Sequence, residues 1–187
     1  MFARTKRLTL RPGWPEDAPA VARAIGHEEV VRMLARVPWP YRLADAEDFL
    51  ARPRAATEIH LMILTHEQAD AAPRLVGAIG VAPQPEGHEL GYWLTPDAWG
   101  RGYATEAGRA VVAMARHGLG LKRLVSCHFI DNPASGRVLA KLGFRPTGLG
   151  TRHSWGRGAE VQARELALDL SGQEEDADTD DTRAMAA

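Results

Sequence analysis

The sequence predicts a single α/β domain, of the α+β kind, built around a mixed β-sheet. The chain has 187 residues, which matches one domain. Hydrophobic residues make up 45% and charged residues 25%, enough apolar side chains for a sizeable core in an ordinary globule. Strand patterns come in a run first and then alternate with helix patterns, which is typical of a mixed sheet. We expect the domain over residues 1–170 and a disordered acidic tail over 171–187.

The first half of the chain predicts one strand, two helices and three further strands. Leu8 and Leu10 alternate with polar residues, which predicts a strand. Apolar residues then recur at helical spacing and are interrupted at Gly26, and Pro53 ends a second short helix. The expected segments are a strand over Thr5–Arg11, a helix whose apolar residues run from Val21 to Leu34, a helix over Asp45–Arg52, and strands over Glu58–Thr65, Leu75–Val81 and His88–Leu94.

The second half predicts helix, strand, helix and two closing strands. One apolar stripe marks the first helix, and Gly143 is placed to end the second. The expected segments are a helix over Gly102–Gly118, a strand over Leu121–Ile130, a helix over Pro133–Leu142, and strands from Phe144 onward and over Val161–Leu170. The glycine- and arginine-rich stretch between the last two strands, Gly148–Gly158, is expected to be irregular.

The formal net charge of −1 hides two unlike parts. Residues 171–187 carry six acidic residues and one basic residue, so the tail has a net charge of −5 and the body +4. A body at +4 can attract an anionic ligand but is too weakly basic to indicate a nucleic-acid partner. The tail has no apolar periodicity and reads as disordered; it is either a solubilising segment or an autoinhibitory or partner-binding one.

Apolar run length, the first residues, and the cysteine and histidine positions together predict the compartment and the metal content of the protein. The longest apolar runs, such as 110–115, fall far short of the roughly 18–20 residues of a membrane span. The first residues lead into a strand pattern and not into the apolar core of a secretory signal. One cysteine, Cys127, forms neither an internal disulfide nor a zinc cluster, and the histidines show no metal-ligand spacing. We expect a cytoplasmic protein with no metal and no membrane partner.

The most informative stretch runs from Glu89 to Ala107, with the sequence ELGYWLTPDAWGRGYATEA. A strand ends at Leu94, and a short loop carrying Gly100 and Gly102 leads into a long helix. Free backbone N–H groups at a helix N-terminus, in a loop with few Cβ atoms, form a site for phosphate or pyrophosphate. A tight turn is the alternative. The pattern is not a P-loop and is a poor match to a dinucleotide-binding fingerprint.

The second stretch runs from Asp131 to Phe144, with the sequence DNPASGRVLAKLGF. By itself it predicts a capped helix that a glycine ends. Taken with WGRGYATEA, it resembles the GNAT superfamily of acetyl-CoA-dependent N-acyltransferases. The first stretch resembles the loop that wraps the CoA pyrophosphate, and the second the segment beside the pantetheine arm. The form of the first stretch and the opening RLTLRP at residues 7–12 resemble the RimJ/RimL-type branch. The resemblance covers about residues 5–170.

The resemblance implies a GNAT-like fold, in which helices flank a central mixed sheet with two splayed parallel strands, here His88–Leu94 and Leu124–Ile130. It also implies a direct attack of an amine on acetyl-CoA, with no acyl-enzyme. The Leu94 backbone N–H would stabilise the oxyanion. Asn132 would bind the pantetheine or position its helix. The residues implied to bind acetyl-CoA are Leu94, Gly100, Arg101, Gly102, Tyr103, Ala104, Thr105, Asn132 and Ser135.

The resemblance also implies a general acid and a general base for the reaction, and the sequence departs from the family pattern at the acid. Many family members have a tyrosine that protonates the leaving thiolate, but Leu139 occupies that position here. Ser135 or a water molecule must then serve. The resemblance makes Glu89 the leading general base, although a solvated or salt-bridged carboxylate is the alternative. Glu106, in the first helical turn, is expected to be structural.

Two functions from different classes remain open at this point. The first is an acetyl-CoA-dependent N-acetyltransferase, active on a protein N-terminus or a small amine such as an amino sugar or polyamine. The second is a degenerate module that binds acyl-CoA without turnover. Either protein would be a monomer or a homodimer. Loop aromatics at Trp39, Tyr41 and Trp155 either line the acceptor pocket or pack simply.

Overall fold

A computed structural model describes residues 1–67 and 72–172 of the chain, so the prediction for the acidic tail lies outside the described residues beyond Gly172. Apart from the 3-10 helices Pro15–Asp17 and Pro96–Ala98 and the π-helical segment Met114–Gly118 after α4, strands and α-helices follow the predicted order, with one extra short strand at the start and one extra short α-helix. The elements are β1 (Ala3–Arg4), β2 (Leu8–Arg11), α1 (Ala18–Ile25), α2 (Glu28–Val31), α3 (Leu43–Ala51), β3 (Ile59–Thr65), β4 (Arg74–Gln84), β5 (Gly87–Leu94), α4 (Tyr103–Ala113), β6 (Arg123–Phe129), α5 (Pro133–Lys141), β7 (Arg145–Ser154) and β8 (Ala159–Asp169).

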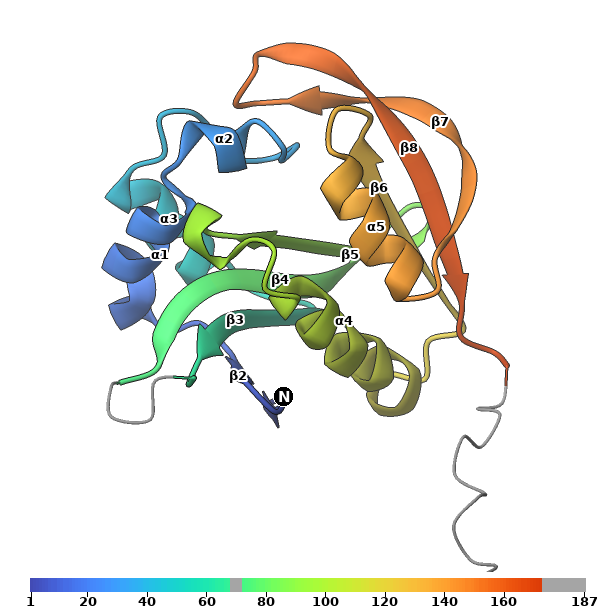
Figure 1. Cartoon of the computed structure of the whole chain (residues 1–187), viewed down its shortest axis with the longest axis horizontal. Coiled ribbons are helices and arrows are strands. Elements are labelled where there is room, and N and C mark those ends of the chain that lie inside the picture. Colours follow the sequence, from blue (N-terminus) through green and yellow to red (C-terminus); the bar gives the residue numbers. More distant parts are fainter. Residues whose placement is uncertain (68–71, 173–187) are drawn as a thin grey trace, which may run out of the picture.

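The described strands form one sheet in the order β1-β2-β3-β4-β5-β6-β8-β7 (Figure 1). Every neighbouring pair is antiparallel except β5 and β6, which are parallel. The parallel pair is made by a crossover through α4, because parallel strands cannot be joined by a tight turn. The mixed sheet that the sequence predicted is confirmed.

The two parallel strands separate soon after they meet. Only two residue pairs, His88 with Leu124 and Glu89 with Val125, are in register. One position further, the Ser126 hydroxyl donates to the Leu90 carbonyl at 2.8 Å. Beyond that bond β5 stays with β4 and β6 stays with β8 (Figure 1). The sheet is therefore split between its two halves, as the resemblance implied.

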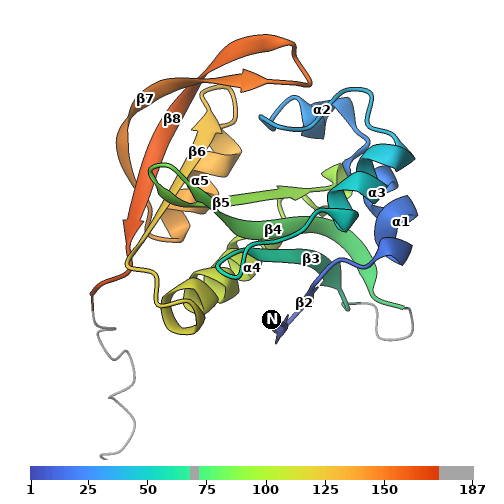
Figure 2. The same cartoon turned by 180° about the vertical axis from the view of Figure 1, so that it is seen from behind.

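Helices cover both faces of the sheet, and each face has its own apolar cluster. The larger cluster joins the sheet to α4 and α5, with Tyr103, Val111 and Leu139 fully buried in it. α1 and α3 lie on the other face (Figure 2). The smaller cluster packs them there through Val21 and Ala46. No helix in residues 1–67 and 72–172 is long and apolar enough to cross a membrane.

The structure corrects the expectation of an irregular segment over Gly148–Gly158. Residues up to Ser154 continue β7 and pair with β8, and only 155–158 form a turn. The register shifts between Pro146 and Gly148, where proline has no N–H to give to the ladder. Pairing with a long neighbour has outweighed the weak strand propensity of the glycines.

Candidate active site

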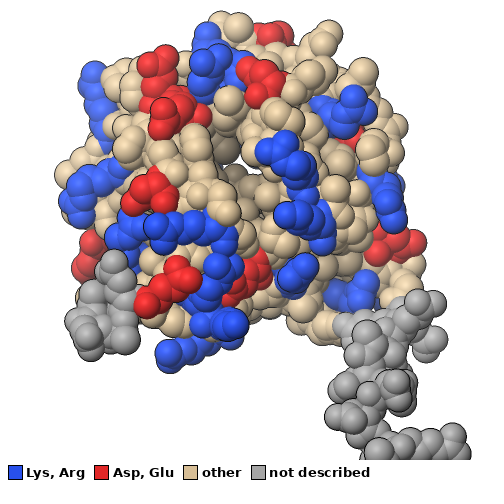
Figure 3. Space-filling view, viewed as in Figure 1, with Lys and Arg blue, Asp and Glu red and all other residues tan. Residues whose placement is uncertain are grey.

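A cavity of about 640 Å³ lies where β5 and β6 separate. The strands supply two of its walls, and the starts of α4 and α5 and the segment after α2 supply the rest. Figure 3 shows the corresponding hollow at the centre of the molecule. Its lining includes Leu90, Tyr92 and Leu94 from one side of β5 and Glu89 and Trp93 from the other. Because side chains alternate along a strand, the cavity reaches both faces of the sheet.

One end of the cavity is the loop that leads into α4. Gly100 and Gly102 have φ of +74° and +79°, a left-handed conformation that favours glycine. A Cβ atom on Gly100 would stand in open space, because nothing lies within 4 Å of that position. Gly102 is the N-cap of α4, and glycine has no side chain to accept a hydrogen bond from the first N–H groups of the helix. The first N–H groups of α4, at Tyr103, Ala104 and Thr105, are therefore left for a ligand.

The predicted residues of this loop do not all face the cavity. Gly100, Gly102, Tyr103, Ala104 and Thr105 line it. The Arg101 side chain is half exposed and instead approaches the Glu67 carboxylate at 3.8 Å.

Glu106 fixes the start of α4 to the first strands. Its carboxylate accepts hydrogen bonds from the Thr5 hydroxyl at 2.6 Å, the Arg7 backbone N–H at 2.9 Å and the Arg7 Nε at 2.7 Å. Burial by itself would raise the pKa of Glu106, but these hydrogen bonds outweigh it and lower the pKa below its usual value. These contacts connect the start of α4 to Thr5 and Arg7, which agrees with the structural role expected for Glu106.

The backbone at Leu94 faces the gap between the strands. Thr95 N–H donates to the Val76 carbonyl at 2.9 Å, which places a hydrogen-bonded pair one position beyond Gly77 and Leu94, the last pair of the β4–β5 ladder. Such pairs alternate along an antiparallel ladder, so the Leu94 N–H and carbonyl are directed away from β4. The Trp99 indole N–H accordingly reaches the Leu94 carbonyl at 2.9 Å. A backbone N–H is therefore aimed into the cavity at the position that sequence reasoning selected.

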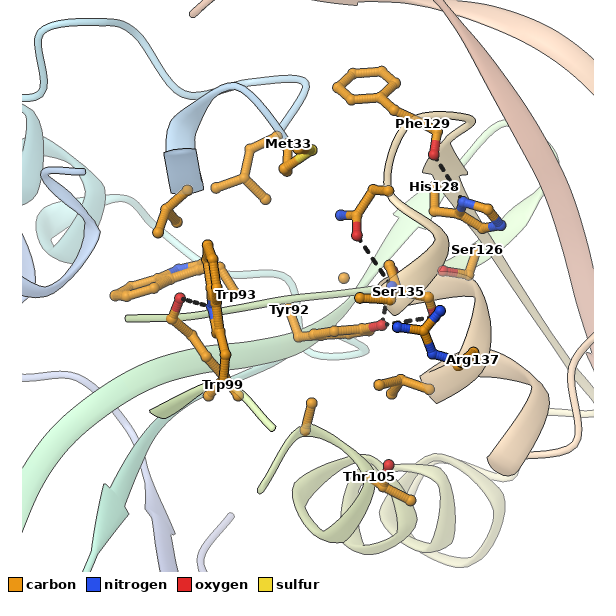
Figure 4. Close-up of a pocket in the computed structure, with 18 of the residues that line it drawn as sticks. Met33, Tyr92, Trp93, Trp99, Thr105, Ser126, His128, Phe129, Ser135 and Arg137 are labelled. Atoms are coloured by element: carbon orange, nitrogen blue, oxygen red, sulfur yellow. Dashed lines mark hydrogen bonds between the residues drawn. The ribbon is translucent and has the colours of Figure 1, made fainter. Parts of the chain in front are cut away.

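The opposite wall joins β5 to the start of α5 through a pair of hydroxyl groups. Tyr92 Oη lies 2.8 Å from Ser135 Oγ and 3.2 Å from the Ser135 carbonyl oxygen (Figure 4). Asn132 Oδ1 accepts from the Ser135 N–H at 3.1 Å and caps the helix. Asn132 thus positions its helix, one of the two roles considered for it. Tyr92 was not selected from the sequence.

Glu89 lies on the other side of β5 from Tyr92. Its Oε2 is 3.4 Å from the Arg36 guanidinium, which also donates to Gln84 at 3.0 Å. The Cys127 thiol is 3.6 Å from Glu89 Oε1. Glu89 keeps 26% of its side chain exposed, so the carboxylate is salt-bridged and still lines the cavity. The salt-bridged carboxylate that the sequence left open is therefore observed, and the role of Glu89 as a general base stays a prediction.

Cys127, on β6, is half-buried and forms part of the cavity wall. Burial and the neighbouring Glu89 raise the pKa of its thiol to about 11. Such a thiol stays protonated at neutral pH and is a poor nucleophile. Leu139, in contrast, is fully buried in the larger core cluster.

The three loop aromatics turn out to pack simply or to face solvent. Tyr41 packs against the smaller core cluster, and Trp39 and Trp155 are 41% and 58% exposed. Met33 and Leu34, from the segment after α2, line the cavity instead. No pattern in the sequence marked this segment as a cavity wall.

Comparison with known proteins identifies the family of this chain. The model of the acetyltransferase (GNAT) domain family matches residues 7–145. An uncharacterized N-acetyltransferase of Bacillus subtilis (strain 168), YoaA, is 29% identical over 157 residues, which cover 78% of this chain and 83% of that protein.

Two solved structures show the same fold. A ribosomal-protein-S5-alanine acetyltransferase from Vibrio fischeri has a TM-score of 0.76 at 14% identity and covers 91% of this chain and 97% of its own. A spermidine N-acetyltransferase from Vibrio cholerae, solved with CoA and spermine, has a TM-score of 0.74 at 15% identity and covers 89% of this chain and 98% of its own. With the family model matched over most of its folded part, the chain belongs to the GNAT acetyltransferase family.

Proposed function

We propose that this protein transfers the acetyl group of acetyl-CoA to a primary amine by direct attack. The observation that carries the proposal is a cavity that passes from one face of the sheet to the other where β5 and β6 separate. It brings a helix N-terminus without a side-chain cap and a pair of hydroxyls to one side of β5. The other side has a carboxylate. An anionic cosubstrate and an amine can therefore approach from opposite faces.

The residues around the α4 loop suit the pyrophosphate of CoA. Gly100, Gly102, Tyr103, Ala104 and Thr105 would offer backbone N–H groups and the positive end of the helix dipole. The open space beside Gly100 is where phosphate oxygens would lie. Arg101 would contribute its backbone, since its side chain is turned toward Glu67. The pantetheine arm would run past Asn132 and Ser135 toward Leu94.

The reaction then uses groups from both faces of the sheet. The amine nitrogen attacks the thioester carbon while the Leu94 N–H donates to the developing oxyanion. Glu89 takes the proton of the amine, directly or through water. When the C–S bond breaks, the electron pair leaves on sulfur, and Ser135 donates a hydrogen bond to the thiolate. Most of the rate enhancement would come from positioning and from the oxyanion donor, because a thiolate is already a fair leaving group.

The acceptor is either a protein N-terminus or a small amine. The RimJ/RimL-type features of the sequence and the fold shared with a ribosomal-protein acetyltransferase support the first. The fold shared with a spermidine acetyltransferase supports the second. We place the protein in the cytoplasm, as a monomer or homodimer.

One observation favours a second function, that of an acyl-CoA-binding module without turnover. Leu139 occupies the position where, by the family resemblance, a tyrosine would act as the general acid, and its side chain is buried in the core. Release of CoA thiol from acetyl-CoA, measured with and without a panel of peptides, amino sugars and polyamines, separates the two functions. The transferase releases thiol only when a suitable amine is present, and the mass of that amine rises by one acetyl group. A binding module releases none with any acceptor.

A further inference from the structure

The contact between Tyr92 and Ser135 joins two elements that are far apart in the chain. Tyr92 extends from β5 across the cavity wall to the first turn of α5 (Figure 4). Ser135 is held at two backbone atoms: Asn132 Oδ1 accepts from its N–H at 3.1 Å, and Tyr92 Oη lies 3.2 Å from its carbonyl oxygen. The third contact, 2.8 Å from Tyr92 Oη to Ser135 Oγ, is the shortest. The serine main chain is therefore fixed, and only its hydroxyl can rotate.

The hydroxyl hydrogens of Tyr92 and Ser135 can be arranged in two ways. Each hydroxyl has one hydrogen to donate. When Tyr92 donates to the Ser135 carbonyl, the serine hydroxyl donates to Tyr92 Oη and has no hydrogen for the cavity. When Tyr92 donates to Ser135 Oγ, the serine hydrogen is released toward the cavity. An acceptor with negative charge in the cavity selects the second arrangement, because hydrogen bonds to charged groups are the stronger ones.

We infer that Tyr92 is a positioning residue that acts through Ser135, turning the serine hydroxyl into a hydrogen-bond donor for the sulfur of CoA. This inference rests on the proposed function, which brings the thioester sulfur to Ser135. Because Leu139 has no hydroxyl, the hydrogen bond to the sulfur would come from a pair of other hydroxyls, that of Ser135 on α5 and that of Tyr92 on β5.

The atoms of the step balance without a proton leaving Tyr92. The C–S electron pair goes to sulfur, which then accepts the hydrogen bond from Ser135 Oγ, while Oγ accepts from Tyr92 Oη. Burial raises the pKa of Tyr92 to about 12, and the hydrogen bond with Ser135 only partly offsets this effect. The phenol therefore keeps its hydrogen at any working pH and polarises the serine instead of ionising. The thiolate takes its proton from water after release.

Other charged and titratable groups also line the cavity. Arg137 and Lys141 extend from α5, and Asp131 lies just before it. Cys127 and His128 line the cavity from β6, and Glu89 lines it from the other side of β5. Their fields act on a bound thiolate whether or not Tyr92 has its hydroxyl. A test must therefore compare variants with each other at the same pH.

A binding experiment at equilibrium can detect the hydrogen-bond donor at the CoA sulfur without any turnover. We would measure by calorimetry the affinities of CoA and of desulfo-CoA, which lacks the sulfur atom, at about pH 7 and about pH 9.5, on either side of the usual thiol pKa of about 8.5. A hydrogen-bond donor at the sulfur favours the thiolate, so the affinity of CoA relative to desulfo-CoA should rise with pH by several-fold, approaching 10-fold. Tyr92→Phe and Ser135→Ala should each lose most of this rise. Tyr41→Phe, a partly buried tyrosine away from the cavity, is the matched control and should keep it.

Turnover supplies an independent readout of the same pair. Tyr92→Phe and Ser135→Ala should each lower kcat by about 10-fold with the KM for acetyl-CoA unchanged. The double variant should be no slower than the slower single variant, because both changes remove one shared donor. A residue that only packs would change KM or the melting temperature and not kcat alone.

The outcomes separate this inference from the proposed function. If Tyr92→Phe keeps the full pH-dependent rise while Ser135→Ala loses it, Ser135 acts without Tyr92 and the inference is wrong. A wild-type protein with no rise in relative affinity overturns it as well. If the rise and its loss in both variants are observed but no amine is acetylated, the sulfur site stands and the transferase function fails.

Discussion

At the residue scale, Glu89 both lines the cavity and pairs with Arg36. The ion pair keeps the carboxylate in place, and the cavity gives it access to an incoming amine. If it removes the proton of the amine, Glu89→Gln should lower kcat by about 100-fold or more, the usual contribution of a general base, with CoA affinity kept. The loss should shrink at high pH, where the amine deprotonates without help.

Glu165→Gln is the matched control for this substitution. Glu165 lies on β8 and pairs with Arg152 at 3.3 Å, so the same chemical change is made close by but outside the main cavity. We expect kcat to stay within about twofold of the wild-type value, since a surface ion pair is worth little. A loss in Glu89→Gln that does not vary with pH would point to acceptor binding and would contradict the role of a base.

The residues that sequence reasoning missed share one property, namely that their roles depend on partners far along the chain. Tyr92 alternates correctly within its strand, but its partner Ser135 is 43 positions away on a helix. Cys127 reads as a core residue because β6 is interior to the sheet, and only the separation from β5 exposes it to the cavity. Gly100 and Gly102 were selected because a glycine loop at a helix start is a local feature, whereas Leu94 was implied by the family resemblance.

At the element scale, the loop before α4 makes the sharpest prediction for cosubstrate binding. Gly100→Ala adds a Cβ atom in the space assigned to phosphate oxygens, and we expect CoA affinity to fall by about 10-fold or more. Gly120→Ala is the control, because Gly120 also has a positive φ, +63°, with nothing within 4 Å of a Cβ. Both variants should lose roughly 1–2 kcal/mol of stability from backbone strain. Equal CoA affinities in the two variants, measured by calorimetry, would disprove the pyrophosphate assignment.

The contact between β3 and α3 predicts a pH dependence of stability. The His60 ring packs edge-on against Phe49, with ring centroids 4.7 Å apart. Burial lowers the pKa of His60 to about 4, with help from the nearby arginines. The unfolded chain binds a proton near pH 6.5, so the stability that neutral His60 provides is present above about pH 6.5 and lost as the pH falls toward about 4.

Stability at pH 5 and pH 7.5 tests this contribution. His60 should account for a loss of roughly 1–2 kcal/mol between these two pH values, a loss that His60→Leu should remove. Urea unfolding of both proteins at the two pH values gives the difference. An equal pH dependence in the variant and the wild type would show that His60 does not titrate on unfolding.

The elements themselves were predictable to different degrees. Amphipathic α4 and the strands of the sheet centre follow from periodicity, because their apolar faces must be buried. β7 did not, since Gly148 and Gly150 have weak strand propensity and are fixed only by pairing with β8. Separation of β5 from β6 is not encoded in either strand's pattern, and the family resemblance alone implied it.

At the scale of the whole molecule, the folded body closes at its C-terminal end with Leu170. Its side chain is buried and its N–H donates to the Lys122 carbonyl at 2.9 Å. From the acidic composition of residues 171–187, the sequence predicts too little apolar surface to offset the entropy of ordering. Truncation after Gly172 should therefore leave the melting temperature and the CoA affinity unchanged. A large drop in either would show that the tail docks on the body.

The most direct test of the central claim is CoA thiol release from acetyl-CoA by the wild-type chain, measured against a panel of peptide N-termini and small amines. We predict release that depends on the amine, saturates with acetyl-CoA, appears as one acetyl group on the acceptor by mass spectrometry, and falls in Glu89→Gln. Binding of acetyl-CoA without release for any acceptor in the panel would contradict the account and leave an acyl-CoA-binding module.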